Sequence, residues 1–317
     1  MSQPFTHTAV VGAGAVGSYY GAMLARARHR VTLIGRAAHA QAIAHDGLQL
    51  HKDGRVEAVR VAASSELTAA RDADLVLFCV KSTDTEGVAR ELAPHLRAGA
   101  WVMSLQNGVD NAPTLARLLP GHTIVPTVVY VATAMPAPGV VQHHGRGDLV
   151  VGPLDAASAR QADFAAGLQR LVDLFASAEV PVRVSPDVMT ELWRKLMVNC
   201  AYNAISALAQ ASYGEMVELA PIRELQRTIV GEVVAVAAAS GVELPLAAAV
   251  AAMERIAPAM PAQLSSTAQD VARRKPSEID HLNGFVVRRG RELGIATPAN
   301  QALHALVKLV ESRHARA

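Results

Sequence analysis

The sequence has little cysteine and no long uninterrupted apolar run. Cys79 and Cys200 are the two cysteines among 317 residues, and both lie in apolar segments. Two such thiols do not make a disulfide framework, so we expect a reducing compartment, the cytoplasm. A membrane-spanning helix needs about 18 or more consecutive apolar residues, and no such run is present. The amino terminus also lacks the pattern of a secretory signal peptide.

Charged and aromatic residues are also scarce. Charged residues make up 18% of the chain and aromatic residues 4%, and the formal net charge is +2. Without a basic run, nucleic acid is not indicated as a partner, and a small anionic ligand would need only a local positive site. Hydrophobic residues reach 51%, which excludes a disordered chain and provides for a sizeable core. The length suits one large domain or two ordinary ones.

The first half of the sequence alternates strand-like and helix-like segments. We predict strands at His7–Gly12, Arg30–Gly35, Asp74–Val80, Trp101–Gln106 and Thr123–Thr133, short strands within Val140–Val151, and a last strand at Val180–Ser185. Helices are predicted at Ala15–Ala27 and Ala156–Ala178. Strands that alternate with helices indicate a doubly wound α/β domain. The strand at Asp74–Val80 is apolar beyond its first residue, as expected in a parallel sheet that is covered on both faces.

After residue 185 the pattern changes to long amphipathic segments. Helices are predicted at Glu191–Ala209, Pro221–Ser240, Leu246–Ile256, Ser277–Gly290 and Pro298–Arg313, and no convincing strand remains. We therefore predict an α/β domain over residues 1–185 and an all-α domain over residues 186–317.

A glycine-rich turn follows the first predicted strand. The segment GAGAVG has the G-x-G-x-x-G spacing and opens the first predicted helix. Gly12 permits the tight turn, Gly14 lets the backbone approach a pyrophosphate, and Gly17 lets the helix pack closely on the strand. The backbone N–H groups of Ala15 and Val16, at the helix N-terminus, would bind phosphate. This context predicts a Rossmann-like dinucleotide-binding domain; the alternative is a glycine-rich turn without a ligand.

The end of the second predicted strand bears on the choice of cofactor. Sites that prefer NAD usually carry an acidic residue there for the ribose 2′-hydroxyl. This chain has Gly35 and Arg36 and no carboxylate nearby. Because a guanidinium binds a 2′-phosphate through two hydrogen bonds, we predict NADP(H). The alternative for Arg36 is an ordinary exposed arginine.

Two further polar residues follow predicted strands. Lys81 comes after Asp74–Val80, and Asn107 comes after Trp101–Gln106. In open α/β sheets ligands bind at the carboxyl edge of the strands, so both residues are candidates for cofactor binding. The alternative for each is a loop residue with no ligand.

The segment ELWRKLMVNCAYN, which starts at Glu191, carries a polar column on an otherwise apolar helix. Residues four apart advance about 40° and rise about 6 Å, so Lys195, Asn199 and Asn203 lie in one column, with Ser206 on the same side. One interpretation is a solvent-facing stripe. Asparagine is a poor helix former, however, and a solvated stripe would carry more charge. From spacing alone, a stripe that faces a ligand is an equal alternative.

Together these motifs resemble the ketopantoate reductase family. The resemblance rests on GAGAVG, the Lys81 loop, QNG at Gln106–Gly108, WRKLMVNCAYN and SSTAQDVARRKPSEIDHLNG at Ser265–Gly284, in that order over essentially the whole chain. It implies NADPH-dependent reduction of a 2-keto acid to the 2-hydroxy acid, with 2-dehydropantoate reduced to pantoate in pantothenate biosynthesis.

The resemblance also implies roles for individual residues. Lys195 would be the catalytic acid, with Glu278 as its acidic partner. Asn107 would bind near both cofactor and substrate, and Asn199, Asn203 and Ser266 would hold the hydroxyl and carboxylate ends of the substrate. One departure concerns substrate identity: many relatives have asparagine where this chain has Gln263. Locally, Ser265, Ser266 and Ser277 also fit helix N-caps.

Other interpretations stay open. The chain could be another two-domain dehydrogenase, of the opine or 6-phosphogluconate type, or a non-catalytic sensor of NADP(H). Lys195 together with Glu278 argues against a sensor, which needs no proton donor. No metal site is expected, because the adjacent His143 and His144 would point to opposite faces of a strand. The expected partner is a small 2-keto acid, with no membrane, and the sequence leaves a homodimer open.

Overall fold

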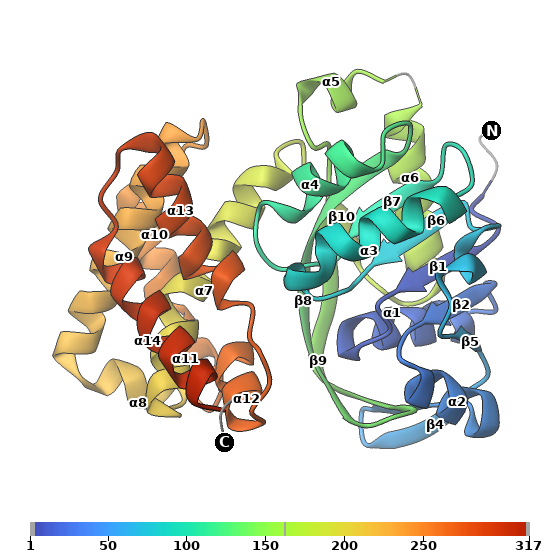
Figure 1. The fold of residues 1–317 in the computed structure, drawn as a ribbon, viewed down its shortest axis with the longest axis horizontal. Coiled ribbons are helices and arrows are strands. Elements are labelled where there is room, and N and C mark those ends of the chain that lie inside the picture. Colours follow the sequence, from blue (N-terminus) through green and yellow to red (C-terminus); the bar gives the residue numbers. More distant parts are fainter. Residues whose placement is uncertain (1–3, 162, 315–317) are drawn as a thin grey trace. The chain divides into compact units, whose positions relative to one another are not determined.

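The structure is a computed structural model that describes residues 4–161 and 163–314. The chain divides into two compact units, which we call the α/β unit and the helical unit (Figure 1). The division falls between Val188 and Met189, and the short segment Asn107–Val109 groups with the helical unit. The boundary predicted from the sequence lies slightly earlier, after residue 185.

The α/β unit contains a mixed sheet. Its strands are β1 (Thr8–Val11), β2 (Val31–Ile34), β3 (Leu48–Lys52), β4 (Arg55–Val59), β5 (Ala62–Ser64), β6 (Leu75–Phe78), β7 (Trp101–Ser104), β8 (Thr123–Ala137), β9 (Val140–Val151) and β10 (Val182–Val184). Within the described residues they form one 10-stranded sheet in the order β4-β3-β9-β8-β7-β6-β1-β2-β5, with β10 paired to β9.

The parallel part of this sheet is the predicted doubly wound core. Strands β8, β7, β6, β1, β2 and β5 lie side by side and all neighbouring pairs are parallel. All residues of β1, β6 and β7 are buried, as expected for strands covered on both faces. The chain runs outward from β1 to β2 and β5, then returns to β6 on the other side of β1. This reversal places the usual ligand-binding crevice at the carboxyl ends of β1 and β6.

An antiparallel extension completes the sheet. The first residues of β8 pair with β7, whereas Thr127 and later residues pair with β9 in antiparallel register. The predicted series of short strands within Val140–Val151 is wrong, because this segment is one strand, with register shifts in its pairing to β8. The antiparallel hairpin β3–β4 was missed, although Asp53 and Gly54, both with positive φ, are a hairpin-turn signal.

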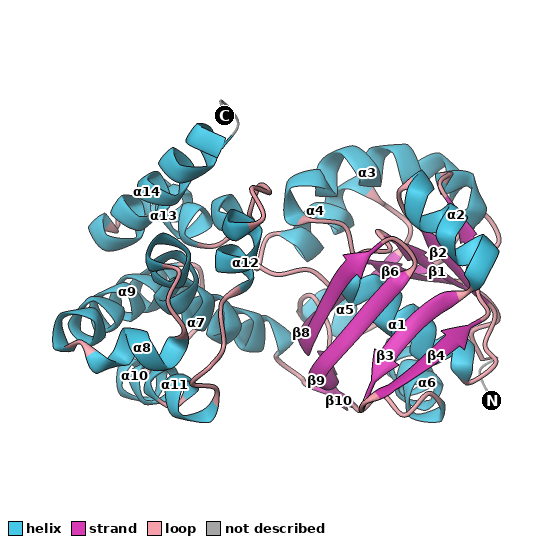
Figure 2. Cartoon of the chain, turned by 90° about the horizontal axis from the view of Figure 1, so that it is seen from below, coloured by secondary structure: helices cyan, strands magenta, loops and turns pink. Residues whose placement is uncertain are grey.

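Helices cover both faces of the sheet. They are α1 (Ala15–Arg26), α2 (Ala37–Asp46), α3 (Thr85–Leu92), α4 (Asn111–Leu118), α5 (Ala156–Ala159) and α6 (Phe164–Ser177), with 3-10 turns η1 (Leu67–Ala70), η2 (Ser82–Asp84) and η3 (Ala93–His95). Figure 2 shows α3 and α4 on one side of the strands and α1 and α6 on the other. Alternation along β1 serves both cores: Val10 packs with α1 and α6, and Ala9 and Val11 pack with α3 and α4. The single helix predicted over Ala156–Ala178 is instead divided into α5 and α6.

The helical unit is all-α, as predicted. It comprises α7 (Val188–Ala209), α8 (Tyr213–Glu218), α9 (Ala220–Ala239), α10 (Leu246–Glu254), α11 (Ile256–Ala259), α12 (Ser266–Ala272), the 3-10 turn η4 (Ile279–His281), α13 (Asn283–Leu293) and α14 (Pro298–His314). The helix predicted over Ser277–Gly290 is wrong over Ser277–Leu282, because α13 begins only at Asn283. Leu282, at φ −108° and ψ −106°, leaves the helical region between η4 and α13 and breaks the segment.

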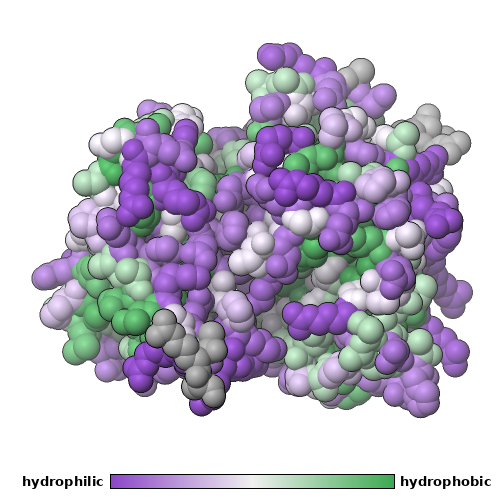
Figure 3. All heavy atoms as spheres, in the orientation of Figure 1, coloured by the Kyte–Doolittle hydropathy of each residue, from purple (hydrophilic) through white to green (hydrophobic). Residues whose placement is uncertain are grey.

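The surface drawn in Figure 3 is largely hydrophilic on both units, with hydrophobic side chains limited to patches. None of the helices in the described ranges is long and apolar enough to cross a bilayer.

Candidate active site

The glycine-rich turn joins β1 to α1, and Gly12 is held by its neighbours. The N–H groups of Gly12 and Ala13 both donate to the carbonyl of Ile34, at 2.9 Å each. Gly12 has φ +91°, and a Cβ atom there would lie 2.5 Å from the backbone nitrogen of Val80. A side chain at this position would be strained and would also collide with the backbone after β6.

Gly17 and Gly14 differ in what surrounds them. A Cβ atom on Gly17 would lie 2.6 Å from the carbonyl oxygen of Gly12 and 2.9 Å from Val10 Cγ1, so Gly17 permits close helix–strand packing. A Cβ atom on Gly14 would meet nothing within 4 Å among the described residues. Gly14 is also the N-cap of α1, where no described side chain caps the helix. The first N–H groups of α1, those of Ala15 and Val16, have no acceptor within the helix, so this end fits an anionic ligand.

A buried polar chain, not found from the sequence, supports this turn. The N–H of Gly139 donates to His39 Nδ1 at 2.8 Å, so the ring proton is on Nε2 and is donated to Ser18 Oγ at 3.0 Å. Ser18 Oγ in turn donates to the carbonyl of Ala13 at 3.3 Å. Burial lowers the pKa of His39, in agreement with a neutral ring. This series of hydrogen bonds connects the glycine-rich turn to α2 and to the turn between β8 and β9.

Arg36 lies at the end of β2, next to the strand that carries the glycine-rich turn. It is the exposed N-cap residue of α2 and follows Gly35, whose added Cβ atom would meet Ala13 Cβ at 3.1 Å. The first turn of α2 reads Ala37, Ala38 and His39, so a carboxylate is absent from this stretch of the sequence. A positive group therefore stands where an acidic residue would favour NAD.

Lys81 and Asn107 follow β6 and β7, which are neighbours in the sheet. Lys81 is half-buried and precedes η2, and Asn107 is half-buried and begins the segment that groups with the helical unit.

A network of buried amides and hydroxyls lies beside Lys81 and Asn107. Gln106 Nε2 donates to the carbonyl of Val80 at 3.1 Å and to Thr85 Oγ1 at 2.7 Å. Thr85 Oγ1 donates to Asn111 Oδ1 at 2.8 Å, and Asn111 Nδ2 donates to Ser82 Oγ at 3.0 Å. These hydrogen bonds thus fix the neighbours of Lys81, which are Val80 and Ser82, and the residue before Asn107, which is Gln106. Sequence reasoning used Gln106 only as part of a motif and missed Thr85 and Asn111.

The polar column predicted on the helix that starts near Glu191 lies on α7. This helix is continuous over Val188–Ala209, so Lys195, Asn199 and Asn203 share one side of it. Lys195 and Asn199 are half-buried, Asn203 is 3% exposed and Ser206 is fully buried. The C-terminal half of the column, Asn203 and Ser206, is therefore not a solvent-facing stripe.

Asn203 is joined to the start of α12. Its Nδ2 atom lies 3.5 Å from Ser266 Oγ, which brings together two of the predicted substrate-binding residues. Ser265 anchors this junction, because its Oγ donates to the carbonyl of Asn203 at 3.2 Å and accepts from the N–H of Ala268 at 3.0 Å. Ser265 is thus the N-cap of α12, and Ser266 is left exposed at the first helical position. The N-cap alternative holds for Ser265 and is wrong for Ser266.

Glu278 precedes η4 and contacts Asn107. Asn107 Nδ2 donates to Glu278 Oε2 at 3.0 Å, across 171 positions of sequence. The neighbouring Ser277 is not the cap of an α-helix: its Oγ accepts from the N–H of Ile279 at 3.3 Å and donates to Glu311 Oε1 at 2.6 Å. The structure therefore brings together four of the predicted site residues in two contacts, Asn107 with Glu278 and Asn203 with Ser266.

Other reactive side chains show ordinary structural contacts. His143 stacks on Tyr19 of α1, with ring centroids 4.6 Å apart, and its Nε2 atom donates to the carbonyl of Arg146. The described residues contain no group of three or more His, Cys, Asp or Glu side chains that could hold a metal. Cys79 and Cys200 are free thiols, and burial raises the pKa of both, so neither suits a nucleophile.

A doubly wound sheet with a glycine-rich turn at its switch point, followed by an all-helical unit, is the architecture of a two-domain dinucleotide-binding protein. The family model "Ketopantoate reductase PanE/ApbA" matches residues 8–156, and the model of its C-terminal domain matches residues 187–311. The chain belongs to the ketopantoate reductase family, which confirms the resemblance found in its motifs.

Similar proteins of known sequence cover nearly the whole chain. A 2-dehydropantoate 2-reductase of Halobacterium salinarum is 34% identical over 305 residues, which cover 95% of this chain and 98% of that protein. A 2-dehydropantoate 2-reductase of Vibrio cholerae is also 34% identical, over 97% of this chain and 99% of that protein.

Two solved structures with the same fold carry the names of different enzymes. A PanE/ApbA family ketopantoate reductase from Ralstonia eutropha JMP134 has a TM-score of 0.89 and 51% identity, over 98% of this chain and 99% of that chain. A D-mandelate dehydrogenase, solved with NADH and anilino(oxo)acetate, also has a TM-score of 0.89, at 25% identity over the same shares. Two of the similar structures, both of D-mandelate dehydrogenase, contain NADH.

Proposed function

We propose that the protein reduces 2-dehydropantoate to pantoate with NADPH, as a step of pantothenate biosynthesis. The observation that supports this most is the column on α7, in which Lys195 and two amides share one side and Asn203 reaches Ser266. A small 2-keto acid needs such a set: donors for its carboxylate and hydroxyl oxygens, and one acid beside its ketone.

Lys195 is the proposed proton donor. NADPH, when bound, supplies a hydride to the ketone carbon. Negative charge then develops on the ketone oxygen, and an ammonium beside that oxygen stabilises the charge and transfers its proton to form the hydroxyl. The lysine regains its proton from solvent. The half-buried place of Lys195 on α7 strengthens its charge interactions relative to a fully solvated lysine.

Glu278 is the proposed acidic partner. Its carboxylate accepts a hydrogen bond from Asn107 Nδ2 at 3.0 Å, which orients the Oε2 atom. A carboxylate near a lysine favours the charged ammonium, the form that can give a proton. Asn107 thereby serves the reaction through Glu278 in addition to its predicted place near cofactor and substrate.

The glycine-rich turn and its neighbours are the proposed cofactor site. The open space at Gly14 and the free N–H groups of Ala15 and Val16 fit a pyrophosphate, while Arg36 fits the 2′-phosphate that distinguishes NADPH. Gly12 and Gly17 shape the turn, and Lys81 adds a positive group after β6.

A second candidate is a reductase for a different 2-keto acid. The mandelate dehydrogenase with this fold favours it, because its bound anilino(oxo)acetate is a bulkier 2-oxo acid. Gln263, where many relatives have asparagine, lies just before α12, and its Nε2 atom donates to the adjacent carbonyl of Leu264 at 2.6 Å. This local bond turns the amide toward its own backbone, three residues before Ser266. A non-catalytic sensor is disfavoured, since it would need neither Lys195 nor Glu278.

A panel of substrates distinguishes these candidates. The purified protein is given NADPH and, in turn, 2-dehydropantoate, 2-ketoisovalerate, pyruvate and phenylglyoxylate, and cofactor oxidation is followed by absorbance. We expect the highest kcat/KM with 2-dehydropantoate. Preference for phenylglyoxylate would favour the second candidate, and NADPH binding without turnover of any of the acids would contradict both.

We also propose a location in the cell and an oligomeric state for the protein. The unpaired thiols Cys79 and Cys200 suit the reducing cytoplasm. A homodimer stays a prediction, which light scattering after size-exclusion chromatography tests.

A further inference from the structure

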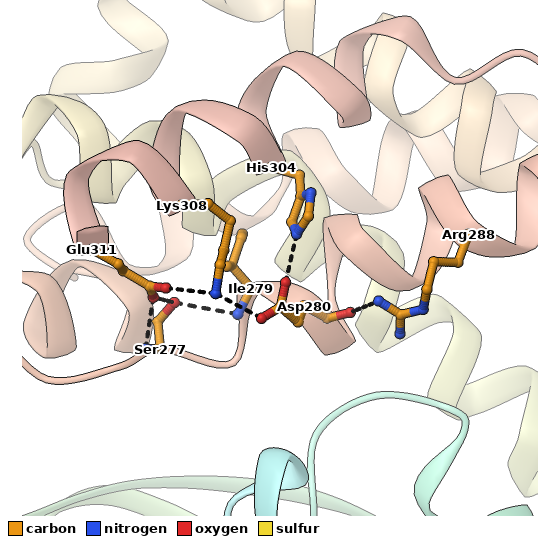
Figure 4. A network of polar contacts seen from close by, with 7 residues as sticks. All are labelled: Ser277, Ile279, Asp280, Arg288, His304, Lys308 and Glu311. Carbon is orange, nitrogen blue, oxygen red and sulfur yellow. Dashed lines mark hydrogen bonds and ion pairs between the residues drawn. The ribbon is translucent and has the colours of Figure 1, made fainter. Parts of the chain in front are cut away.

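Glu278 lies in a short irregular segment between α12 and α13. Glu278 is followed by the single turn η4, in which the N–H of His281 donates to the carbonyl of Glu278 at 2.9 Å, and then by the break at Leu282, so no α-helix continues through this segment. Instead, the residues on both sides of Glu278 are tied to one face of α14, as Figure 4 shows.

On the amino-terminal side, Ser277 is held by Glu311. The N–H of Ser277 donates to Glu311 Oε1 at 2.8 Å, and Ser277 Oγ donates to the same oxygen at 2.6 Å. The side chain of Glu311 is only 12% exposed, so this double hydrogen bond is shielded from water. The residue before Glu278 is therefore fixed through both its backbone and its side chain.

On the carboxyl-terminal side, Asp280 is held by two cationic or ionisable residues of α14. Asp280 Oδ1 accepts from His304 Nε2 at 2.6 Å, and Asp280 Oδ2 accepts from Lys308 Nζ at 2.8 Å. Lys308 also pairs with Glu311 Oε2 at 3.0 Å, which joins the two sides. His304, Lys308 and Glu311 are four and three positions apart and thus share one face of the helix.

The charges of this cluster agree with its geometry. Hydrogen bonds from His304 and then Lys308 hold the pKa of Asp280 well below its usual range. Partial burial alone would lower the pKa of Lys308, but its hydrogen bonds to Asp280 and Glu311 raise it. Both members of the central pair are therefore ionised at neutral pH.

Gly284, at the start of α13, leaves room for this arrangement. A Cβ atom there would lie 2.8 Å from His304 Nε2 and 3.1 Å from the carbonyl oxygen of Ile279. Any side chain at Gly284 would press on both the ring that holds Asp280 and the backbone next to Glu278.

We propose that Asp280, His304, Lys308 and Glu311 form a clamp that positions the Glu278 carboxylate against Asn107. These are positioning residues, and their role rests on the proposed function of Glu278. Stability alone explains the clamp poorly, because half-exposed ion pairs such as Lys308–Asp280 add little to folding. These contacts instead hold the chain on both sides of Glu278, which limits where its carboxylate can point.

A double-mutant cycle tests the clamp. Asp280→Asn keeps the size of the side chain and removes the charge that binds Lys308, and it is made in the unmutated protein and in a Glu278→Gln variant. The control is Glu254→Gln, which breaks an exposed pair with Arg227 elsewhere in the helical unit. For each variant kcat, the KM values for both substrates and the thermal midpoint are measured.

We expect Asp280→Asn to lower kcat about tenfold to a hundredfold, because small misplacement of a reacting group has costs of this order. KM for NADPH should change less than about twofold, and Glu254→Gln should leave kcat unchanged. In the Glu278→Gln background, Asp280→Asn should cause no further loss. Equal fold losses in both backgrounds would overturn the proposal, since Asp280 would then act independently of Glu278. If Asp280→Asn does not fold, Lys308→Met takes its place with the same expectations.

Rescue separates positioning from packing. Glu311→Gln keeps an oxygen that can accept from Ser277, whereas Glu311→Leu does not. We expect Glu311→Gln to retain most of kcat and Glu311→Leu to lose as much as Asp280→Asn. Equal activity of the two Glu311 variants would contradict a positioning role.

A readout without turnover keeps this inference separate from the proposed reaction. The side-chain amide of Asn107 is observed by NMR, because its Nδ2 atom donates to Glu278. Asp280→Asn should move this signal toward its position in Glu278→Gln, and Glu254→Gln should not move it. If no 2-keto acid is reduced, the proposed function fails while this spectrum still decides the clamp. An Asn107 signal unchanged by Asp280→Asn would overturn the clamp whatever the substrate.

Discussion

Two glycines of the same turn should respond in opposite ways to one added methyl group. Gly12→Ala places a Cβ atom 2.5 Å from the backbone nitrogen of Val80, at a residue with φ +91°. Gly14→Ala places it in open space, at φ −83°, which any residue adopts. We expect Gly12→Ala to destabilise the α/β unit and Gly14→Ala to spare the fold but weaken cofactor binding.

The magnitudes follow from these surroundings. A left-handed conformation costs a non-glycine residue about 1–2 kcal/mol, and overpacking against backbone adds about 1–3 kcal/mol. Gly12→Ala should therefore cost about 2–5 kcal/mol, or roughly 5–15 °C in the thermal midpoint of a unit of this size. For Gly14→Ala only the N-cap preference changes, which costs less than about 1 kcal/mol. Its methyl group would occupy the approach of the pyrophosphate, and we expect the Kd for NADPH to rise at least about tenfold, or 1.4 kcal/mol.

The assay pairs thermal unfolding without cofactor with calorimetric titration of NADPH into each folded variant. Gly14→Val extends the series, with a larger side chain that should abolish binding and leave the fold in place. Undiminished affinity of Gly14→Ala and Gly14→Val would show that the turn is only structural. A thermal midpoint of Gly12→Ala equal to that of the unmutated protein would refute the packing argument.

Four other outcomes are expected. Lys195→Ala should lower kcat on the best 2-keto acid about 10²–10³-fold while the Kd for NADPH stays within about twofold; unmutated turnover would exclude Lys195 as the acid. Asn199→Ala and Asn203→Ala should mainly raise KM for the 2-keto acid, and a pure loss of kcat would assign them to the chemical step instead. The unmutated protein should prefer NADPH, and Arg36→Asp should narrow or reverse that preference; equal kcat/KM with NADH and NADPH before mutation would contradict the role of Arg36. Hydrogen bonds from His304 lower the pKa of Asp280 in the folded state. The ionised Asp280 should therefore stabilise the fold fully above the usual aspartate pKa, and this stabilisation should be lost as the pH falls below that pKa. In urea titrations at a series of pH values, Asp280→Asn should abolish this contribution to the loss of stability in acid.

Local patterns predicted the core elements and much of the candidate site. The strand–glycine–helix junction at Gly12 and the spacing of Lys195, Asn199 and Asn203 depend on contacts within one or two turns of chain, so they follow from neighbouring residues. The missed hairpin β3–β4 also had a local signal, the Asp53–Gly54 turn. The errors over Val140–Val151 and Ser277–Gly290 arose where tertiary contacts override local preference.

The sequence by itself determined the α/β and all-α halves, the family and the polar column, because hydrophobic period and motif spacing are properties of short segments. Only the tertiary structure decided that Asn203 is buried while Asn199 is half-exposed, that Ser265 and not Ser266 caps α12, and that Asn107 meets Glu278. These outcomes depend on which distant segments pack together. Such packing is governed by burial and by hydrogen bonds across many positions of sequence, which periodicity along the chain does not encode.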